Sequence, residues 1–204
     1  MENHLKLSGE NMDEGTITVV SGLPRSGTSM MMKMLERGGI TPLTDHEREA
    51  NIDNPKGYYE FERVKKLPED TGWLEQAKGK SVKVLAELIK HLPECYEYKV
   101  VFMERHLEEV IESQKKMLLR KGEDPDDISD EELYDMFIKY RAMLKEHIKE
   151  HPSMEAIYIS YNDIIHEPKE HVGRLNRFLN GGLDVEKMVE VVDEDLYRNR
   201  ADEI

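Results

Sequence analysis

The chain lacks the sequence features typical of secreted and membrane-embedded proteins. Among its 204 residues there is one cysteine, Cys95, so no disulfide can form within it and a reducing compartment is expected. No apolar run approaches the ~20 residues that a membrane-spanning helix needs, and the polar N-terminus carries no signal-peptide pattern. These absences predict a cytoplasmic protein with no membrane partner.

The chain also lacks an excess of positive charge. The chain has 29 basic and 43 acidic residues and a formal net charge of −14. General nucleic-acid binding needs a basic face that neutralises phosphates, so we expect no nucleic-acid partner. A local basic pocket for a small anion is compatible with this balance, because binding follows the local field.

Metal-ligand patterns are lacking as well. Two of the eight histidines, His147 and His151, stand four residues apart at the end of an expected helix. No third ligand and no His-Glu-x-x-His pattern accompanies them. We therefore expect no metal site.

What the sequence does contain is an alternation of strand-like runs and helical segments. Short runs rich in Val, Ile or Tyr predict buried strands at 16–21, 81–85, 98–103 and 156–161. Amphipathic spacing and capping signals predict helices at 28–37, 107–120, 129 to about 151, and 168–179. This alternation predicts a three-layer α/β fold with a mostly parallel sheet of about four or five strands.

The domain organisation expected from this pattern is simple. Residues 1–15 are polar and are expected to be a disordered N-terminus. Residues 16–204 are expected to form a single domain, since a chain of this length most simply builds one core.

The most informative segment runs from Thr16 to Met30. An apolar β-branched run ends at Gly22, a loop with a second glycine at Gly27 follows, and a helix begins near Thr28. Backbone N–H groups and a helix N-terminus converge on an anion in such a phosphate-binding loop. The usual lysine of a nucleoside-triphosphate loop is replaced by Thr28, which favours a nucleotide with a single 5′-phosphate and a group attached to it. An ordinary strand-to-helix turn is the alternative.

Side chains of this loop add further donors. Arg25 offers a planar guanidinium that stays charged, and the serine and threonine residues offer hydroxyls. The residues expected to bind the nucleotide here are Gly22, Pro24, Arg25, Ser26, Gly27, Thr28 and Ser29.

A second candidate phosphate site follows the third strand-like run. That run ends at Arg105, and Ser113 comes two helical turns later. Ligands of open parallel sheets bind beyond the carboxyl ends of the strands, so Arg105 and the Gly22 loop should open on the same edge. An arginine with a serine suits a second phosphate group. Alternatively, Arg105 forms a surface ion pair with Glu104 or Glu109.

Together the two elements resemble the sulfotransferases that use 3′-phosphoadenosine 5′-phosphosulfate (PAPS). In that family a strand, loop and helix bind the 5′-phosphosulfate, and an Arg and a Ser with seven intervening residues bind the 3′-phosphate. Residues 23–29 match the first motif in its arginine-containing form, and Arg105 with Ser113 matches the second. Segments similar to those of bacterial members are 54–60, 158–168 and 196–200. The chain is identified as a small bacterial-type member with a P-loop-like fold.

The resemblance implies in-line transfer of a sulfuryl group from PAPS to a hydroxyl or amine of an unknown acceptor. No metal is required, because Arg and backbone dipoles stabilise the leaving phosphate. Arg25 would take that role, residues 26–29 would hold the 5′-phosphate, and Arg105 with Ser113 would hold the 3′-phosphate. Arg198 and Arg200 would fold over the nucleotide, or belong to a flexible tail.

The remaining catalytic candidates are a general base and a further positive charge. Family members place the general base after the first helix, often as Glu or His. That region offers Asp45, His46, Glu47 and Glu60, of which we favour Asp45 and Glu60. Lys83 supplies a charge near the sulfuryl group, or is a solvated lysine.

Two other function classes are compatible with parts of the pattern. One is a P-loop kinase or hydrolase, against which Thr28 and the lack of a clear Mg²⁺-binding acid at a strand end both argue. The other is a non-catalytic nucleotide-binding relative, with intact motifs but no functional base. Because the chain is short for the family, a second subunit of a homo-oligomer is one way to complete an acceptor site.

Overall fold

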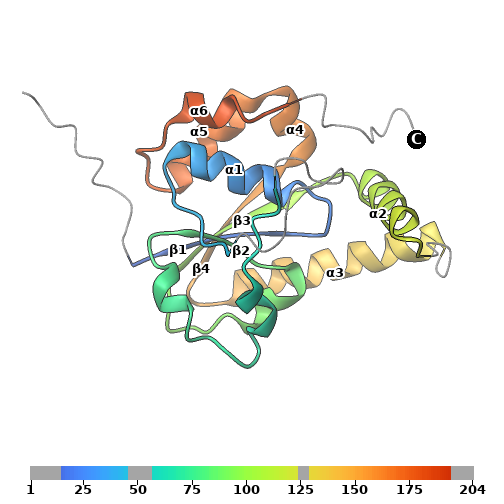
Figure 1. Ribbon diagram of the computed structural model, residues 1–204, viewed down its shortest axis with the longest axis horizontal. Coiled ribbons are helices and arrows are strands. Elements are labelled where there is room, and N and C mark those ends of the chain that lie inside the picture. Colours follow the sequence, from blue (N-terminus) through green and yellow to red (C-terminus); the bar gives the residue numbers. More distant parts are fainter. Residues whose placement is uncertain (1–14, 46–56, 124–128, 194–204) are drawn as a thin grey trace, which may run out of the picture.

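The computed structural model describes residues 15–45, 57–123 and 129–193 (Figure 1). Its sheet consists of β1 (Ile17–Gly22), β2 (Ser81–Lys83), β3 (Tyr98–Glu104) and β4 (Met154–Ser160). The strand order is β2-β1-β3-β4, and every neighbouring pair is parallel. The predicted α/β fold with a parallel sheet is therefore confirmed. Residues 1–14 of the N-terminal segment 1–15 lie outside the described ranges, and the single-domain organisation of 16–204 stays a prediction.

The sheet separates two apolar cores because successive strand side chains point to opposite faces. Val20 and Val101 face a core that contains α1 (Thr28–Gly38), α4 (Tyr161–His166), α5 (Pro168–Phe178) and α6 (Val185–Val189). Val19 and Val100 face a core that contains α3 (Asp130–Glu150) and three short 3₁₀ segments, Glu62–Lys66, Leu74–Ala77 and Ala86–His91. Figure 1 shows α1 and α4–α6 together on one side of the sheet and α3 on the other. These are the expected three layers.

The central position of β1 decides where its loop lies. All six residues of β1 are buried, as expected for a strand with neighbours on both sides and helices over both faces. Gly22 pairs with Met103 of β3, so the loop after β1 and the chain after β3 leave the sheet side by side. α2 (Leu107–Lys121) begins at this same edge.

Several boundaries differ from the expected ones. β2 ends at Lys83 because Leu85 precedes a 3₁₀ turn. β4 is shifted to 154–160, because the Ser160 hydroxyl accepts a hydrogen bond from the Asp163 N–H at 3.1 Å and starts α4 at Tyr161. The sequence patterns did not predict α4, α6 or the 3₁₀ segments, which are too short for a periodic signal. The predicted capping box of Ser129 and Glu132 is present at the start of α3.

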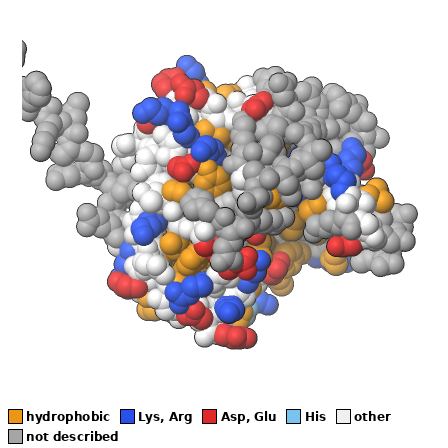
Figure 2. Space-filling view, in the orientation of Figure 1, with side chains coloured by type: hydrophobic (Ala, Val, Ile, Leu, Met, Phe, Trp, Pro, Cys, Tyr) orange, Lys and Arg blue, Asp and Glu red, His pale blue; other side chains and the backbone are white. Residues whose placement is uncertain are grey.

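No helix within the described ranges is both long enough and apolar enough to cross a membrane. On the face drawn in Figure 2, Lys and Arg side chains are interspersed with Asp and Glu side chains.

Candidate functional site

The loop between β1 and α1 has backbone geometry that requires its second glycine. Gly27 has a φ of 93° and adjoins the first residue of α1. A Cβ added to Gly27 would lie 2.3 Å from Cδ2 of Tyr161. Gly27 therefore lets the aromatic ring of α4 approach the loop backbone, which no larger residue would allow.

Ser26 closes the loop from inside. Its side chain is 1% exposed, and its hydroxyl donates a hydrogen bond to the Leu23 carbonyl at 2.7 Å. The Ser26 N–H also donates to this carbonyl, at 3.2 Å. The donors of Ser26 thus stabilise the turn. Thr28 and Ser29 lie in the first turn of α1, where N–H groups have no intrahelical acceptor and the helix dipole favours an anion.

The two predicted phosphate motifs are in direct contact. Arg25 has a φ of 68°, and its Nε donates a hydrogen bond to Ser113 Oγ at 3.0 Å. Nη1 of Arg105 donates to the carbonyl oxygen of Arg25 at 3.2 Å. The structure therefore brings Arg25, Arg105 and Ser113 together at the edge where β1 and β3 end.

Arg105 is also held by an ion pair that the sequence offered as an alternative. Its Nε donates to Glu109 Oε2 at 2.7 Å, and the two side chains are 8% and 0% exposed. This pair is buried, whereas the alternative interpretation placed it on the surface. Glu104 instead forms ion pairs with Arg141 and Lys145 of α3, at 3.8 and 2.8 Å.

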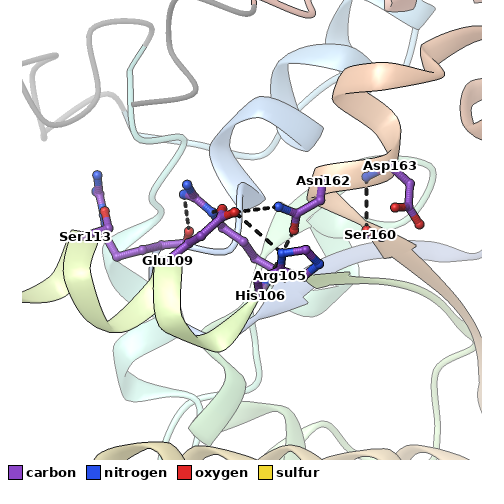
Figure 3. A network of polar contacts seen from close by, with 8 residues as sticks. Arg105, His106, Glu109, Ser113, Ser160, Asn162 and Asp163 are labelled. Atoms are coloured by element: carbon purple, nitrogen blue, oxygen red, sulfur yellow. Dashed lines mark hydrogen bonds and ion pairs between the residues drawn. The ribbon is translucent and has the colours of Figure 1, made fainter. Parts of the chain in front are cut away.

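A polar network surrounds this ion pair (Figure 3). Asn162 Nδ2 donates to Glu109 Oε1 at 2.9 Å. Asn162 Oδ1 accepts the backbone N–H of His106 at 3.2 Å. The Tyr161 ring centroid lies 4.6 Å from Cζ of Arg105, which is cation–π distance. Burial raises the pKa of the Tyr161 hydroxyl, and the nearby Arg105 opposes that rise.

Glu109, Tyr161 and Asn162 were not among the predicted site residues. One signal for Glu109 was available, because Glu109 and Ser113 are four residues apart and share a face of the helix, and Glu109 is also four residues from Arg105. Tyr161 and Asn162 come from α4, and only packing brings them to this edge.

A second group of predicted residues meets at the N-terminus of α1. Nζ of Lys83 donates to the Tyr58 carbonyl at 3.2 Å and to Ser29 Oγ at 3.4 Å. It also lies 3.9 Å from Glu60 Oε1, and these side chains are only 12% and 17% exposed. Lys83 is therefore a partly buried member of this group and not a solvated lysine. Glu60 is the candidate base that the structure brings to it.

Asp45, the other favoured base, supports the segment that carries Glu60. Its Oδ2 accepts the backbone N–H of Glu62 at 2.6 Å. Its own N–H donates to the Glu60 carbonyl at 3.4 Å, and the Thr44 hydroxyl donates to the same carbonyl at 2.8 Å. A carboxylate bonded to a backbone N–H at the start of a 3₁₀ turn stabilises the local backbone.

Other predicted residues lie outside the described ranges: His46, Glu47, Arg198, Arg200 and the start of the 54–60 segment. Among the described residues, no group of three or more His, Cys, Asp or Glu side chains could hold a metal ion. His151 Nε2 instead contacts the Leu92 carbonyl at 3.1 Å.

The arrangement can bind an extended anion. Arg25, Arg105 and Lys83 supply cationic groups along one sheet edge, and the first turn of α1 supplies N–H groups. Two carboxylates, Glu109 and Glu60, offset part of this positive charge through ion pairs with Arg105 and Lys83. Glu109 is fully buried, whereas the Glu60 side chain keeps 17% exposure.

Comparison of the whole fold gives consistent matches. No protein-family model matches the sequence, and no curated protein sequence matches it. Among solved structures, a sulfotransferase domain of the olefin synthase from Synechococcus PCC 7002 has a TM-score of 0.53 at 14% identity, with 92% of this chain and 80% of that domain covered. A sulfotransferase domain of the curacin biosynthetic pathway has a TM-score of 0.51 at 17% identity, with 89% and 79% covered.

A third match is a mouse sulfotransferase, SULT7A1, whose structure is a complex with PAP. Its TM-score is 0.50 at 15% identity, with 92% of this chain and 67% of the mouse protein covered. At such low identity these matches show a shared fold, and the fold is the one that the two phosphate motifs predicted. The chain has the fold of sulfotransferase domains.

Proposed function

We propose that this protein transfers a sulfuryl group from PAPS to a hydroxyl or amine of an acceptor. The observation that carries the proposal is the 3.2 Å hydrogen bond from Arg105 Nη1 to the Arg25 carbonyl. It joins the two motifs that match opposite ends of PAPS, at the sheet edge where parallel folds bind ligands. The mouse relative of similar fold, in complex with PAP, supports a donor of this class.

Each end of the donor has a proposed set of contacts. N–H groups of the first turn of α1 bind the 5′-phosphate. Arg105 and Ser113 bind the 3′-phosphate, since guanidinium and hydroxyl donors suit phosphate oxygens. Arg25 reaches both regions, because its backbone lies in the loop and its Nε lies 3.0 Å from Ser113 Oγ.

The proposed chemistry is a single displacement at sulfur. The acceptor oxygen or nitrogen forms a bond to sulfur while the bond from sulfur to the 5′-phosphate oxygen breaks. That oxygen keeps the electron pair, and Arg25 and Lys83 stabilise the charge that develops on it. Glu60, 3.9 Å from Lys83, takes the proton of the acceptor.

A binding comparison tests the nucleotide class. Calorimetry with 3′-phosphoadenosine 5′-phosphate (PAP), AMP and ATP should give the tightest binding for PAP, because only PAP engages both phosphate sites. Preference for ATP in the presence of Mg²⁺ would favour a kinase or hydrolase. Equal affinity for PAP and AMP would remove the second phosphate site.

A transfer assay tests the chemistry. Radiolabelled PAPS is incubated with a panel of phenols, alcohols, amines and peptides, and labelled product is separated. Formation of any labelled acceptor supports the proposal. Tight PAP binding without transfer to any acceptor class would favour a non-catalytic nucleotide-binding protein.

A further inference from the structure

Arg105 is held from three directions by described residues. Glu109 accepts a hydrogen bond from its Nε at 2.7 Å. The Arg25 carbonyl accepts from Nη1 at 3.2 Å. The Tyr161 ring covers one face, with its centroid 4.6 Å from Cζ. These contacts define both the plane and the direction of a side chain that is otherwise among the most flexible.

Glu109 is itself held in place. Its carboxylate is 0% exposed, and each oxygen has its own donor. Oε2 accepts from Arg105, and Oε1 accepts from Asn162 Nδ2 at 2.9 Å. His106 Nδ1 lies 3.6 Å from Oε1. The carboxylate therefore cannot rotate without losing one of its bonds.

Asn162 has only one orientation that satisfies its surroundings. Its Oδ1 accepts the His106 N–H at 3.2 Å, so its NH₂ group must face Glu109. Exchange of the two amide atoms would place a donor against the His106 N–H and an acceptor against a carboxylate. Asn162 thus orients Glu109, and Glu109 orients Arg105 (Figure 3).

The charge of Glu109 argues that its role is geometric. A carboxylate 2.7 Å from Arg105 reduces the attraction of the guanidinium for an anion. If charge alone determined phosphate binding, Glu109 would weaken it. What Glu109 supplies is a guanidinium whose orientation is fixed before binding, and such preorganisation increases affinity.

We infer that Glu109 and Asn162 are positioning residues that orient Arg105 for the 3′-phosphate end of the nucleotide. This inference rests on the proposed function. It adds α4 to the nucleotide site, through a side chain 53 residues distant from Glu109 in the chain.

The test exchanges the hydrogen-bonding roles within the pair. Glu109→Gln keeps an acceptor for Arg105, but its NH₂ group then faces the NH₂ group of Asn162. Adding Asn162→Asp supplies an acceptor opposite Gln and still accepts the His106 N–H. The double variant therefore satisfies every bond again and keeps the net charge of the wild type. Glu108→Gln is the matched control, because Glu108 is an exposed neighbour in the first turn of α2.

The readout is the ratio of PAP affinity to AMP affinity, measured by calorimetry. Positioning predicts that Glu109→Gln weakens PAP binding by about tenfold, the size of a misaligned charge-assisted bond, with little change for AMP. The double variant should recover most of the ratio, and Glu108→Gln should match the wild type. Thermal unfolding of each variant is recorded in parallel. Should Glu109→Gln fail to fold, the ratio of PAP affinity to AMP affinity is measured for Asn162→Ser, which leaves Glu109 and Arg105 unchanged.

Binding of PAP by the wild type supports the proposed nucleotide class independently of this inference. Given that binding, three results would overturn the positioning role of Glu109 and Asn162. One is a Glu109→Gln variant that binds PAP as tightly as the wild type or more tightly. Another is an equal loss of PAP and AMP affinity, which indicates a purely structural role. The last is a double variant whose melting temperature returns toward that of the wild type while its ratio of PAP affinity to AMP affinity does not. Absence of PAP binding by the wild type itself would instead remove the proposed function.

Discussion

The Nε of Arg25 donates a hydrogen bond to Ser113 Oγ at 3.0 Å, although 88 residues separate them in the chain. Arg25 belongs to the loop after β1, and Ser113 belongs to α2, which follows β3. The contact exists because β1 and β3 are neighbours in a parallel sheet and end at the same edge. This hydrogen bond joins the two predicted phosphate motifs through Arg25.

Arg25→Ala should reduce sulfuryl transfer by at least about 100-fold, as expected for loss of a donor that stabilises developing charge. The free energy of unfolding should change by less than about 1 kcal/mol, since Arg25 is partly exposed in a loop. Arg25→Lys should be intermediate, because it keeps the charge but not the planar set of donors. Transfer rates and urea unfolding curves measure both effects.

The matched control for that experiment is Arg37→Ala. Arg37 lies at the other end of α1 and forms a surface ion pair with Glu190 at 3.5 Å. It removes one positive charge far from the loop, so turnover should be retained. Turnover of Arg25→Ala equal to that of Arg37→Ala would contradict the role of Arg25.

Glu60→Gln should lower kcat by about 100-fold or more, the usual contribution of a general base, with PAP affinity nearly unchanged. Asp45→Asn should behave differently, because the Asp45 carboxylate accepts the Glu62 N–H at 2.6 Å. We expect it to reduce the free energy of unfolding by about 1 kcal/mol and to retain most activity. Steady-state kinetics and chemical denaturation of both variants separate the roles. The opposite pattern would make Asp45 the base.

Gly27→Ala should destabilise the protein more than Gly39→Ala. Both glycines have positive φ, 93° and 110°, so alanine costs about 1–2 kcal/mol at either position. At Gly39 an added Cβ meets no described atom within 4 Å, whereas at Gly27 it meets the Tyr161 ring at 2.3 Å. The clash should add about 1–3 kcal/mol. Denaturation midpoints compare the two, and equal losses would show that the ring moves aside without cost.

The free energy of unfolding should decrease as the pH falls below about 6.5, because His147 binds a proton less readily in the folded protein than in the unfolded chain. Burial lowers the pKa of this imidazole below its ordinary value of 6.5, and His151 and Lys90 lower it further while Glu150 opposes them. The unfolded chain then binds protons more readily than the folded protein as the pH falls, so the stabilisation is present above the ordinary pKa and is lost below it. His147 Nε2 is also buried without a hydrogen-bond partner in the described part of the chain.

The measurement is the free energy of unfolding of wild type and His147→Leu between about pH 8 and pH 5. The variant should show a shallower decline on the acidic side. Parallel curves for the two proteins would indicate that His147 titrates alike in the folded and unfolded states.

Much of the site could be predicted because its signals are local. The β-branched run, Gly22, Gly27 and the following helix are contiguous, and each rests on backbone preference over a few residues. Arg105 follows β3 and Ser113 lies on α2, the next helix in the chain, so a separation of eight residues places both near the start of that helix. The alternation of strands and helices then requires both motifs to open at the carboxyl edge of a parallel sheet.

The choice between bases did not follow from such signals. Asp45 and Glu60 are both acids in one segment, and sequence spacing treats them alike. In the folded chain Glu60 lies 3.9 Å from Lys83, while Asp45 turns to a backbone N–H. Lys83 comes from β2, so this distinction depends on how β2 packs beside β1.

Periodicity and short-range spacing are properties of the linear chain, and they were enough to predict the parallel α/β fold and the two arginine-containing motifs at its edge. Three contacts depend on the folded chain: the ion pair of Arg105 with buried Glu109, the hydrogen bond from Asn162 to this carboxylate, and the packing of Tyr161 against Gly27. Those contacts join the loop after β1, the residue that follows β3, α2 and α4, and their geometry comes from the packing of the core around the sheet.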